Sequence, residues 1–461
     1  MPSWHPQLPS SGYESLYRRL VDAIASDIEA GRLTPGTRLP PQRELAHLLS
    51  ISLGAVTRAY DEATRRGLLT AHVGRGTFVA DPTPADSAYE GEIDLSINTA
   101  PAIQRHSAMV ETLAALRRRP DWEARVSYLP PCGLDDDRRA AMAWLERTAG
   151  LEGRDWRTLI SCSGAQNAMA IAMAATCRPG DSVLCEALTF SGARSLADMQ
   201  DYHLHGVEMD DEGVNPAALD RAAARSGARV FYTLPTLHNP TGRTASLARR
   251  QEIVKVARTR NLLIIEDDVY ALYARNLVLP PLATLAPERA FYISSMSKLV
   301  SPGLRQGFLV TPGGEFFDRC INAARAFMHS PSGISGAVAT EWFQSGRADD
   351  MVRGVCEEMA ARTQMALAAI GGMVETQPAK QTLHLWLGME PDEAERICGR
   401  ALRGGLRLAA PDAFLVPMTN GQTGLRLCIG AASNRATLAR ALDILTTASS
   451  RASMGLHSTT L

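Results

Sequence analysis

Lysine is almost absent from this 461-residue chain, which has 48 lysine and arginine residues together but lysine only at positions 255, 298 and 380. Arginine thus meets nearly every need for plain positive charge. A primary amine can lose its proton and condense with a carbonyl, which a guanidinium cannot do. Lys298 lies in the segment FYISSMSKLVSPGLRQG, residues 291–307, among hydroxyl groups and Arg305 that could bind an anion. These residues alone fit a phosphorylated carbonyl cofactor and a serine-rich surface loop equally well.

Several other features are missing, and each absence excludes a class of protein. The formal net charge is −1, so no global attraction to nucleic acid or membranes is expected and any basic surface must be local. No long apolar run or signal peptide occurs, so no membrane span is expected. The eight cysteines form no CxxC pair, which predicts neither a metal site nor a disulfide framework. Reduced thiols in a cytoplasmic protein are therefore expected.

The first 80 residues predict three short helices followed by a β-hairpin. Apolar residues recur at helical spacing over 13–30, and Pro41 marks the start of a second helix. Ser52 can cap a third helix that runs to Gly67. Strand-like residues flank a Gly-Arg-Gly turn at 74–76, as in a hairpin. This order matches a helix-turn-helix with a wing, although a three-helix unit with a hairpin need not bind DNA.

After a polar stretch with two prolines, residues 81–92, short apolar strands alternate with helices. The polar stretch predicts a linker, and the alternation predicts an α/β domain. Small or polar residues follow three of the strands, at 163–166, 239–242 and 266–268. Because open α/β sheets bind ligands at the carboxyl ends of their strands, these positions are candidates for a ligand site. Each taken singly is equally an ordinary turn or a solvated strand end.

The segment RLPPQRELAHLLSISLGAVTRAYDEATRRGLLTAHVGRGTFV resembles the winged helix-turn-helix of GntR-type bacterial regulators along its whole length. The resemblance implies that residues 13–80 form a domain that binds double-stranded operator DNA. It also implies which side chains approach phosphates or base edges: Arg43, Thr57, Arg58 and Arg75. Many members carry arginine and threonine early in the recognition helix, where this chain has Leu53 and Ala55, so contact there would be apolar or absent.

A second resemblance covers residues 93–447. In order, the chain offers Ser-Gly-Ala-Gln, a phenylalanine, Asn-Pro-Thr-Gly, an aspartate with tyrosine three residues on, Ser-x-Ser-Lys, Pro-Gly-Leu-Arg and a final Gly-Leu-Arg-Leu. This series resembles the fold-type I aminotransferases, which use pyridoxal 5′-phosphate. It implies a mostly parallel central sheet with a smaller C-terminal α/β subdomain, followed by a disordered tail at 448–461. With its N-terminal unit, the whole chain resembles the MocR subfamily of GntR regulators.

The roles of the reacting groups follow from that resemblance. Lys298 would form the internal aldimine with pyridoxal 5′-phosphate, and Asp267 would pair with the pyridine nitrogen. Asn239 and Tyr270 would hydrogen-bond the ring hydroxylate, and Asn239 would also face the substrate. Arg426 would clamp the α-carboxylate of an amino acid, a bidentate task suited to guanidinium.

The same resemblance assigns the residues that would hold the rest of the cofactor. Phe190 would stack on the ring, where tyrosine or tryptophan is commoner. The phosphate would be bound by side chains and backbone N–H groups of Ser295, Ser297, Arg305, Ala165 and Gln166. Tyr128 would reach the phosphate of a neighbouring subunit, which implies a homodimer.

Two functions remain open on the sequence. One is a transcription regulator whose aminotransferase-like domain senses an amino acid or amine by aldimine exchange at Lys298. The alternative is a catalytically active amino acid aminotransferase that carries a DNA-binding domain, since no site residue is visibly missing. The N-terminal unit favours regulation, because an aminotransferase gains nothing from a winged helix.

Overall fold

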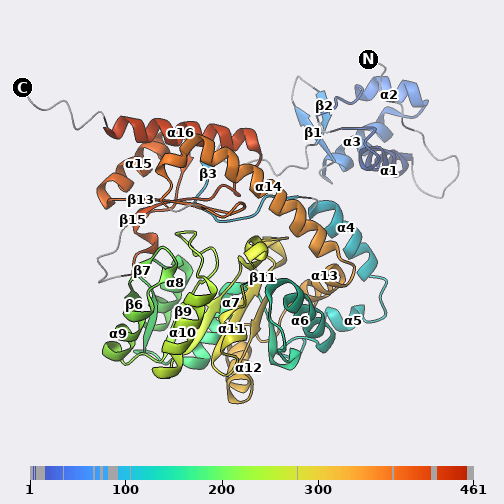
Figure 1. The fold of residues 1–461 in the computed structure, drawn as a ribbon. Coiled ribbons are helices and arrows are strands. Elements are labelled where there is room, and N and C mark those ends of the chain that lie inside the picture. Colours follow the sequence, from blue (N-terminus) through green and yellow to red (C-terminus); the bar gives the residue numbers. More distant parts are fainter. Residues whose placement is uncertain are drawn as a thin grey trace, which may run out of the picture. The chain divides into compact units, whose positions relative to one another are not determined.

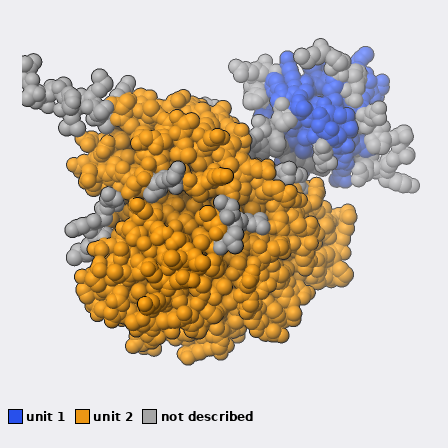
Figure 2. Space-filling model, viewed as in Figure 1, with its two compact units in different colours: residues 1–90 blue, residues 91–461 orange. Residues whose placement is uncertain are grey.

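The chain forms two compact units, residues 1–90 and residues 91–461, in the computed structural model (Figure 2). Each unit has a hydrophobic core of its own. The structure describes Trp4, Pro6 and the ranges 16–34, 36–65, 68–72, 76–80, 92–103, 105–277, 279–375, 378–416 and 423–453. Apart from Glu92, the predicted linker at 81–92 lies outside the described residues.

The first unit contains the three helices and the hairpin that the sequence predicts (Figure 1). Its elements are α1 (Leu16–Glu29), α2 (Gln42–Leu49), α3 (Leu53–Arg65), β1 (Leu69–His72) and β2 (Gly76–Val79). The two strands pair antiparallel. The apolar positions at helical spacing, such as Leu20, Ile24 and Val56, are fully buried, so the periodicity does mark the core face.

The connection between α2 and α3 depends on local polar contacts. Ser50 ends α2 in the left-handed region, with φ 52°. The Ser52 hydroxyl oxygen accepts a hydrogen bond from the N–H of Ala55 at 3.2 Å, as expected of a helix cap. The Thr57 hydroxyl donates to Gln42 Oε1 at 2.8 Å and thereby connects α3 to the start of α2. These contacts hold the two helices as the pair that a helix-turn-helix requires.

The second unit is built on a seven-stranded sheet with the order β4-β12-β11-β10-β9-β5-β6. All neighbouring pairs are parallel except those that β12 makes with β11 and β4. The predicted mostly parallel sheet is thus confirmed. The strands are β4 (Leu159–Cys162), β5 (Ser182–Glu186), β6 (His203–Val207), β9 (Val230–Thr233), β10 (Leu263–Asp267), β11 (Ala290–Ser295) and β12 (Gly307–Val310).

The central strands are buried along nearly their whole length, which explains their continuous apolar sequences. Helix α7 packs on β10, β11 and β12, and α9 packs on β5 and β6 (Figure 1). The helices of this part are α4 (Arg105–Leu116), α5 (Trp122–Arg125), α6 (Asp135–Ala149), α7 (Ala165–Thr176), α8 (Ser191–Gln200), α9 (Pro216–Ser226), α10 (Leu247–Thr259), α11 (Leu282–Leu285), α12 (Glu315–Phe327) and α13 (Gly333–Gln344). Short elements between them are η1 (Trp156–Thr158), β7 (Met209–Asp210), β8 (Gly213–Val214), η2 (Ala271–Leu277) and η3 (Pro302–Leu304).

A smaller α/β subdomain follows near the C-terminus, as predicted. Its elements are α14 (Arg347–Ile370), η4 (Gly371–Met373), β13 (Leu385–Met389), α15 (Pro391–Arg403), β14 (Leu406–Arg407), η5 (Pro411–Phe414), β15 (Thr423–Leu427) and α16 (Arg435–Ser453). Strand β3 (Ile93–Asp94) lies at the start of the second unit in sequence, but it belongs to this subdomain and pairs parallel with β14. Helix α16 packs on α14 and α15 (Figure 1).

Helix α16 also corrects one prediction. It continues to Ser453, so the first residues of the predicted disordered tail at 448–461 are helical. The helix extends because Ala448 still packs into the core of the second unit. Residues 454–461 lie outside the described part of the chain. Within the described part, no helix is both long and apolar enough to cross a membrane.

Candidate functional site

Five of the predicted site residues converge where the central strands end. Asp267 is the last residue of β10, Lys298 follows β11, and Asn239 follows β9. Asn239 Nδ2 donates a hydrogen bond to the Tyr270 hydroxyl at 3.4 Å, and its Oδ1 accepts one from Arg426 at 2.8 Å. Parallel strands bring their carboxyl ends to one edge of the sheet, so residues far apart in the sequence meet there.

Asp267 is a buried carboxylate with only one oxygen in use. Its Oδ2 accepts a hydrogen bond from the Tyr232 hydroxyl at 2.8 Å. Its Oδ1 has no partner among the described residues. Burial raises the pKa of Asp267 to about 6, although the Tyr232 hydrogen bond acts in the opposite direction. An unpaired buried carboxylate oxygen is unfavourable unless a ligand supplies a cation or an N–H group, so Oδ1 marks a ligand-binding atom.

Lys298 points into the same region. Its Nζ donates a hydrogen bond to the backbone carbonyl of Asn98. Burial lowers the pKa of this amine, and the charges of Arg426 and Arg305 act in the same direction. The charge of Asp267 opposes this effect and raises the pKa of the amine. A lowered pKa increases the neutral fraction of the amine, which is the form that attacks a carbonyl carbon.

A buried hydrogen-bond network that the sequence reasoning missed supports Tyr270. Asn98 Nδ2 donates to the Tyr270 hydroxyl and to His384 Nδ1, both at 2.9 Å. His384 Nε2 lies 3.1 Å from the backbone carbonyl of His238, which can only accept, so Nε2 carries the proton and Nδ1 accepts. Burial lowers the pKa of His384 to about 3, which keeps the ring neutral in this role.

Arg426 lies on β15 and is buried against the site. Its two Nη atoms donate to Asn239 Oδ1 at 2.8 Å and to the backbone carbonyl of Ser96 at 2.6 Å. Its guanidinium also lies over the ring of Phe414, 4.7 Å from the centroid. Its Nε has no partner among the described residues. A buried guanidinium with an unused N–H group can bind a carboxylate.

Three of the predicted phosphate ligands, Ala165, Gln166 and Arg305, lie at the start of α7. Gly164 precedes the helix with φ 89°, and Arg305 donates to the carbonyl of Ser163 at 3.2 Å. A Cβ atom on Gly164 would lie 2.3 Å from Arg305 Nη2, so the guanidinium fills the space that a side chain would take. The first N–H groups of α7, those of Ala165 and Gln166, have no acceptor within the helix. Together they form a cradle for an anion.

The remaining predicted cofactor ligands are placed less uniformly. The hydroxyl groups of Ser295 and Ser297 are hydrogen-bonded to each other, with 2.8 Å between the two oxygens. The side chains of Phe190 and Gln166 both lie beside Gly192, where an added Cβ would be 2.4 Å from each of them. Tyr128 stands apart, with 83% of its surface exposed and its ring edge against His329.

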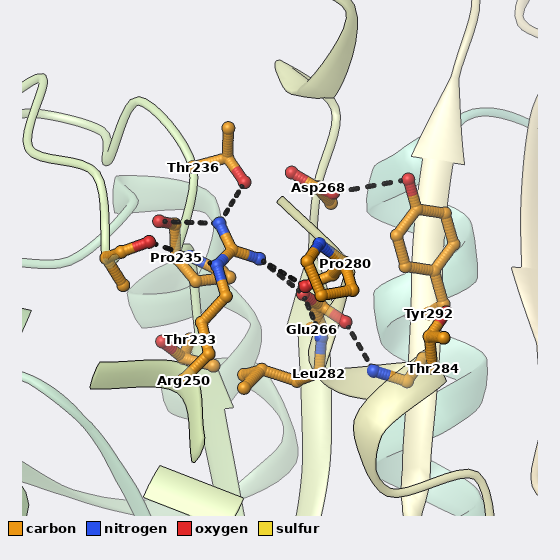
Figure 3. Close-up of polar contacts among 12 residues, drawn as sticks. Thr233, Pro235, Thr236, Arg250, Glu266, Asp268, Pro280, Leu282, Thr284 and Tyr292 are labelled. Carbon is orange, nitrogen blue, oxygen red and sulfur yellow. Dashed lines mark hydrogen bonds and ion pairs between the residues drawn. The ribbon is translucent and has the colours of Figure 1, made fainter. Parts of the chain in front are cut away.

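A second buried cluster fixes the end of β10 from the other side. Figure 3 shows Arg250 beside Glu266, at 3.5 Å, and donating to the Thr236 hydroxyl at 2.9 Å. Glu266 and Asp268 flank Asp267 in sequence, and burial raises the pKa of both, to about 8 for Glu266. Neighbouring side chains of a strand point to opposite faces, so this cluster holds the strand without competing for Asp267.

In the first unit, the structure describes three of the four predicted DNA contacts. Arg43 on α2 and Arg58 on α3 are exposed, while Thr57 is half-buried and its hydroxyl is engaged by Gln42. Arg75, at the predicted hairpin tip, lies outside the described residues. The two exposed arginines remain available to DNA phosphates.

Comparison with known proteins finds two family profiles. That of aminotransferase class I and II matches residues 90–445, and that of the bacterial regulatory proteins of the gntR family matches residues 16–79. YdeF of Bacillus subtilis, named an uncharacterized HTH-type transcriptional regulator, is 26% identical over 96% of both chains. PtsJ of Salmonella typhimurium, named a vitamin B6 salvage pathway transcriptional repressor, is 30% identical over 62% of this chain and 65% of its own.

Solved structures share the fold of the large unit. LysN, an α-aminoadipate aminotransferase from Thermus thermophilus solved with N-(5′-phosphopyridoxyl)-L-leucine, has a TM-score of 0.70 and 24% identity. That similarity covers 80% of this chain and 94% of LysN. An archaeal alanine:glyoxylate aminotransferase has a TM-score of 0.71 and 20% identity, over 78% of this chain and 91% of its own. The fold-type I fold is thereby confirmed.

The residues of the site fit pyridoxal 5′-phosphate. The free Oδ1 of buried Asp267 suits the N–H of a protonated pyridine ring. The buried amine of Lys298 suits an aldehyde, and the cradle of Arg305 at the start of α7 suits a phosphate.

Replacing Gly164 by alanine tests the cradle. We expect Gly164→Ala to weaken the affinity for pyridoxal 5′-phosphate by about ten-fold or more, because the new methyl group displaces Arg305 from its charge-assisted contacts. Titration of the ligand-free protein, followed by absorbance, measures this. Gly180→Ala is the matched control, since Gly180 also has a positive φ but nothing lies within 4 Å of its added Cβ. Equal affinities of the two variants would rule out this cradle.

Asp267→Asn tests whether the unpaired carboxylate lowers stability. Because the pKa of Asp267 is raised in the folded state, folding favours the protonated acid. Protonated Asp267 therefore stabilises the fold below the ordinary pKa of an aspartate, and this contribution is lost as pH rises through about 6. The ligand-free variant should therefore become more stable than wild type between about pH 4 and about pH 7, by about 2–3 kcal/mol. Urea unfolding at several pH values measures the difference. A variant less stable than wild type throughout would contradict this account.

Proposed function

Because the chain belongs to the aminotransferase class I and II family and begins with a gntR-family domain, we propose that it is a DNA-binding transcription regulator whose large domain binds pyridoxal 5′-phosphate and responds to an amino acid or amine. One observation carries this proposal: a single chain joins a helix-turn-helix with exposed Arg43 and Arg58 to the buried site around Lys298. YdeF, named above as an HTH-type transcriptional regulator, matches 96% of both chains, so that match spans both units.

The family and the fold imply pyridoxal 5′-phosphate, whose aldehyde condenses with primary amines and whose protonated ring withdraws electrons. Lys298 would supply the amine, and Asp267 Oδ1 would hold the proton at the ring nitrogen. Asn239 and Tyr270 would hydrogen-bond the ring hydroxyl, since they already meet at 3.4 Å. Phe190 would cover the ring, and the phosphate would be held by Ser295, Ser297, Arg305 and the N–H groups of Ala165 and Gln166.

The effector would be an amine that competes with Lys298. Arg426 selects for a carboxylate beside that amine, because the guanidinium is buried and its Nε is unused within the described chain. Asn239 holds Arg426 at 2.8 Å and thus orients it toward the same small volume. An amino acid satisfies both groups at once, whereas a simple amine satisfies only the first.

We also propose that the regulator acts as a homodimer in the cytoplasm. Tyr128 supports this, because its side chain touches His329 and is nevertheless 83% exposed, so its hydroxyl is accessible to the phosphate of a neighbouring subunit. Helix-turn-helix dimers bind two half-sites one helical turn apart, so a dimer would place two copies of α3 on its operator.

An aminotransferase would use the same side chains, and the first unit is what favours regulation over turnover. The two functions differ in a measurable way. A regulator should form at most about one keto acid per protein molecule from an added amino acid. Many turnovers with an amino acid and keto acid pair would assign the chain to the alternative.

Lys298→Ala should remove the visible absorption band that pyridoxal 5′-phosphate gains when it bonds to a protein amine. The other two lysines are exposed, so Lys255→Ala and Lys380→Ala are matched controls that should keep the band. Absorption spectra after removal of unbound cofactor measure this. A Lys298→Ala protein with an unchanged band would refute the assignment of the amine.

Arg58→Ala should weaken binding to DNA from the region upstream of the protein's own gene by about five-fold or more and lower the salt slope by about one. The reason is the loss of one phosphate contact from the exposed face of α3. Arg225→Ala removes the same charge from the exposed surface of α9 and should have little effect. Electrophoretic mobility shifts over a salt series measure both. Equal affinities of the two variants would show that α3 does not face DNA.

A further inference from the structure

The segment that enters the second unit from the predicted linker passes through the candidate site. The backbone carbonyl of Ser96 accepts a hydrogen bond from Arg426 at 2.6 Å. Two residues later, the carbonyl of Asn98 accepts one from Lys298 Nζ. The chain that leads from the DNA-binding unit is therefore held by the two side chains proposed to meet the effector and the cofactor.

The side chain of Asn98 fixes the position of this backbone. Its two N–H groups are used by the Tyr270 hydroxyl and by His384 Nδ1, both at 2.9 Å. Asn98 is buried, and His384 is held in turn by the carbonyl of His238. An amide with both donors engaged cannot rotate freely, so the Asn98 carbonyl is kept within reach of Lys298.

The residues just before Ser96 are anchored elsewhere. The N–H of Ile93 donates to the carbonyl of Gly405 at 2.7 Å, and the N–H of Leu95 donates to the carbonyl of Arg407 at 2.9 Å. Both acceptors belong to the C-terminal subdomain around β14. Residues 92–98 therefore run from the linker along that subdomain to the site.

Ligands would compete with the backbone for the same donors. When the amine of Lys298 is bonded to an aldehyde carbon, at most one of its three N–H groups remains, which weakens the contact with the Asn98 carbonyl. A carboxylate bound to Arg426 draws the guanidinium away from the Ser96 carbonyl. Cofactor binding thus weakens the hold on Asn98, and carboxylate binding weakens the hold on Ser96. An effector amine that displaces Lys298 from the cofactor restores the first contact.

We propose that residues 92–98 form a tether that couples occupation of Lys298 and Arg426 to the linker of the DNA-binding unit, with Asn98 as the positioning residue. The proposal rests on the function proposed above and adds how the site communicates with that unit. Binding changes the anchoring of the chain at the point where the linker begins, so no long path through the core is required.

Hydrogen exchange in two forms of the wild-type protein tests the tether. The forms are loaded with pyridoxal 5′-phosphate or with pyridoxamine 5′-phosphate, which has the same ring and phosphate but no aldehyde to occupy Lys298. Amides of residues 95–100 should exchange about five-fold faster in the pyridoxal form, because one charge-assisted hydrogen bond is weakened. Equal exchange rates in the two forms would overturn the proposal.

Asn98→Ala should abolish the difference by making exchange fast in both forms. Asn215→Ala is the matched control, because Asn215 caps α9 through a 3.0 Å hydrogen bond to the N–H of Ala218, and it should keep the difference. A full difference in the Asn98→Ala protein would also overturn the proposal. If that variant does not fold, the wild-type comparison still decides.

The affinity for upstream DNA gives an independent readout. It should differ between the two loaded forms of the wild type and of Asn215→Ala, and converge in Asn98→Ala. A retained difference in Asn98→Ala would contradict the tether. Failure of every form to bind DNA would contradict the proposed function, while the exchange rates would still test whether the segment responds to Lys298.

Discussion

The unsatisfied oxygen of Asp267 is the constraint on which the rest of the site depends. A buried carboxylate with one free oxygen destabilises the folded chain, and here burial raises its pKa to about 6. The surrounding structure holds it in place nevertheless: Tyr232 fixes one oxygen, and the Arg250 cluster secures the strand on its other face. Such strain is retained where a ligand relieves it, and a protonated pyridine ring does so with a single hydrogen bond.

The sheet converts this local constraint into a site. Parallel β9, β10 and β11 end side by side, so Asn239, Asp267 and Lys298 meet although they come from separate stretches of sequence. The C-terminal subdomain adds Arg426 from β15, and the segment after β3 adds Asn98. The first and last parts of the large unit thus meet at the site, where Arg426 contacts the carbonyl of Ser96 and Lys298 contacts that of Asn98.

The residues that could be predicted are those that local sequence marks. Asp267 ends an apolar strand, and Lys298 is one of three lysines. Asn98 and His384 carry no such mark, because they are 286 positions apart and become neighbours only in the folded chain. Tyr232 lies in an apolar strand, so its sequence context predicts only a core residue. The helix boundaries followed periodicity well, except at the C-terminus, where packing extends α16 into a polar sequence that was expected to be disordered.

We propose that Asp267 pairs with the ring nitrogen of bound pyridoxal 5′-phosphate and keeps it protonated. The ¹⁵N chemical shift of the cofactor labelled at that nitrogen reports its protonation directly. We expect the pyridinium shift in the wild-type protein at neutral pH, because the free carboxylate oxygen would stabilise the N–H group. The shift of an unprotonated pyridine in the loaded wild-type protein would contradict it.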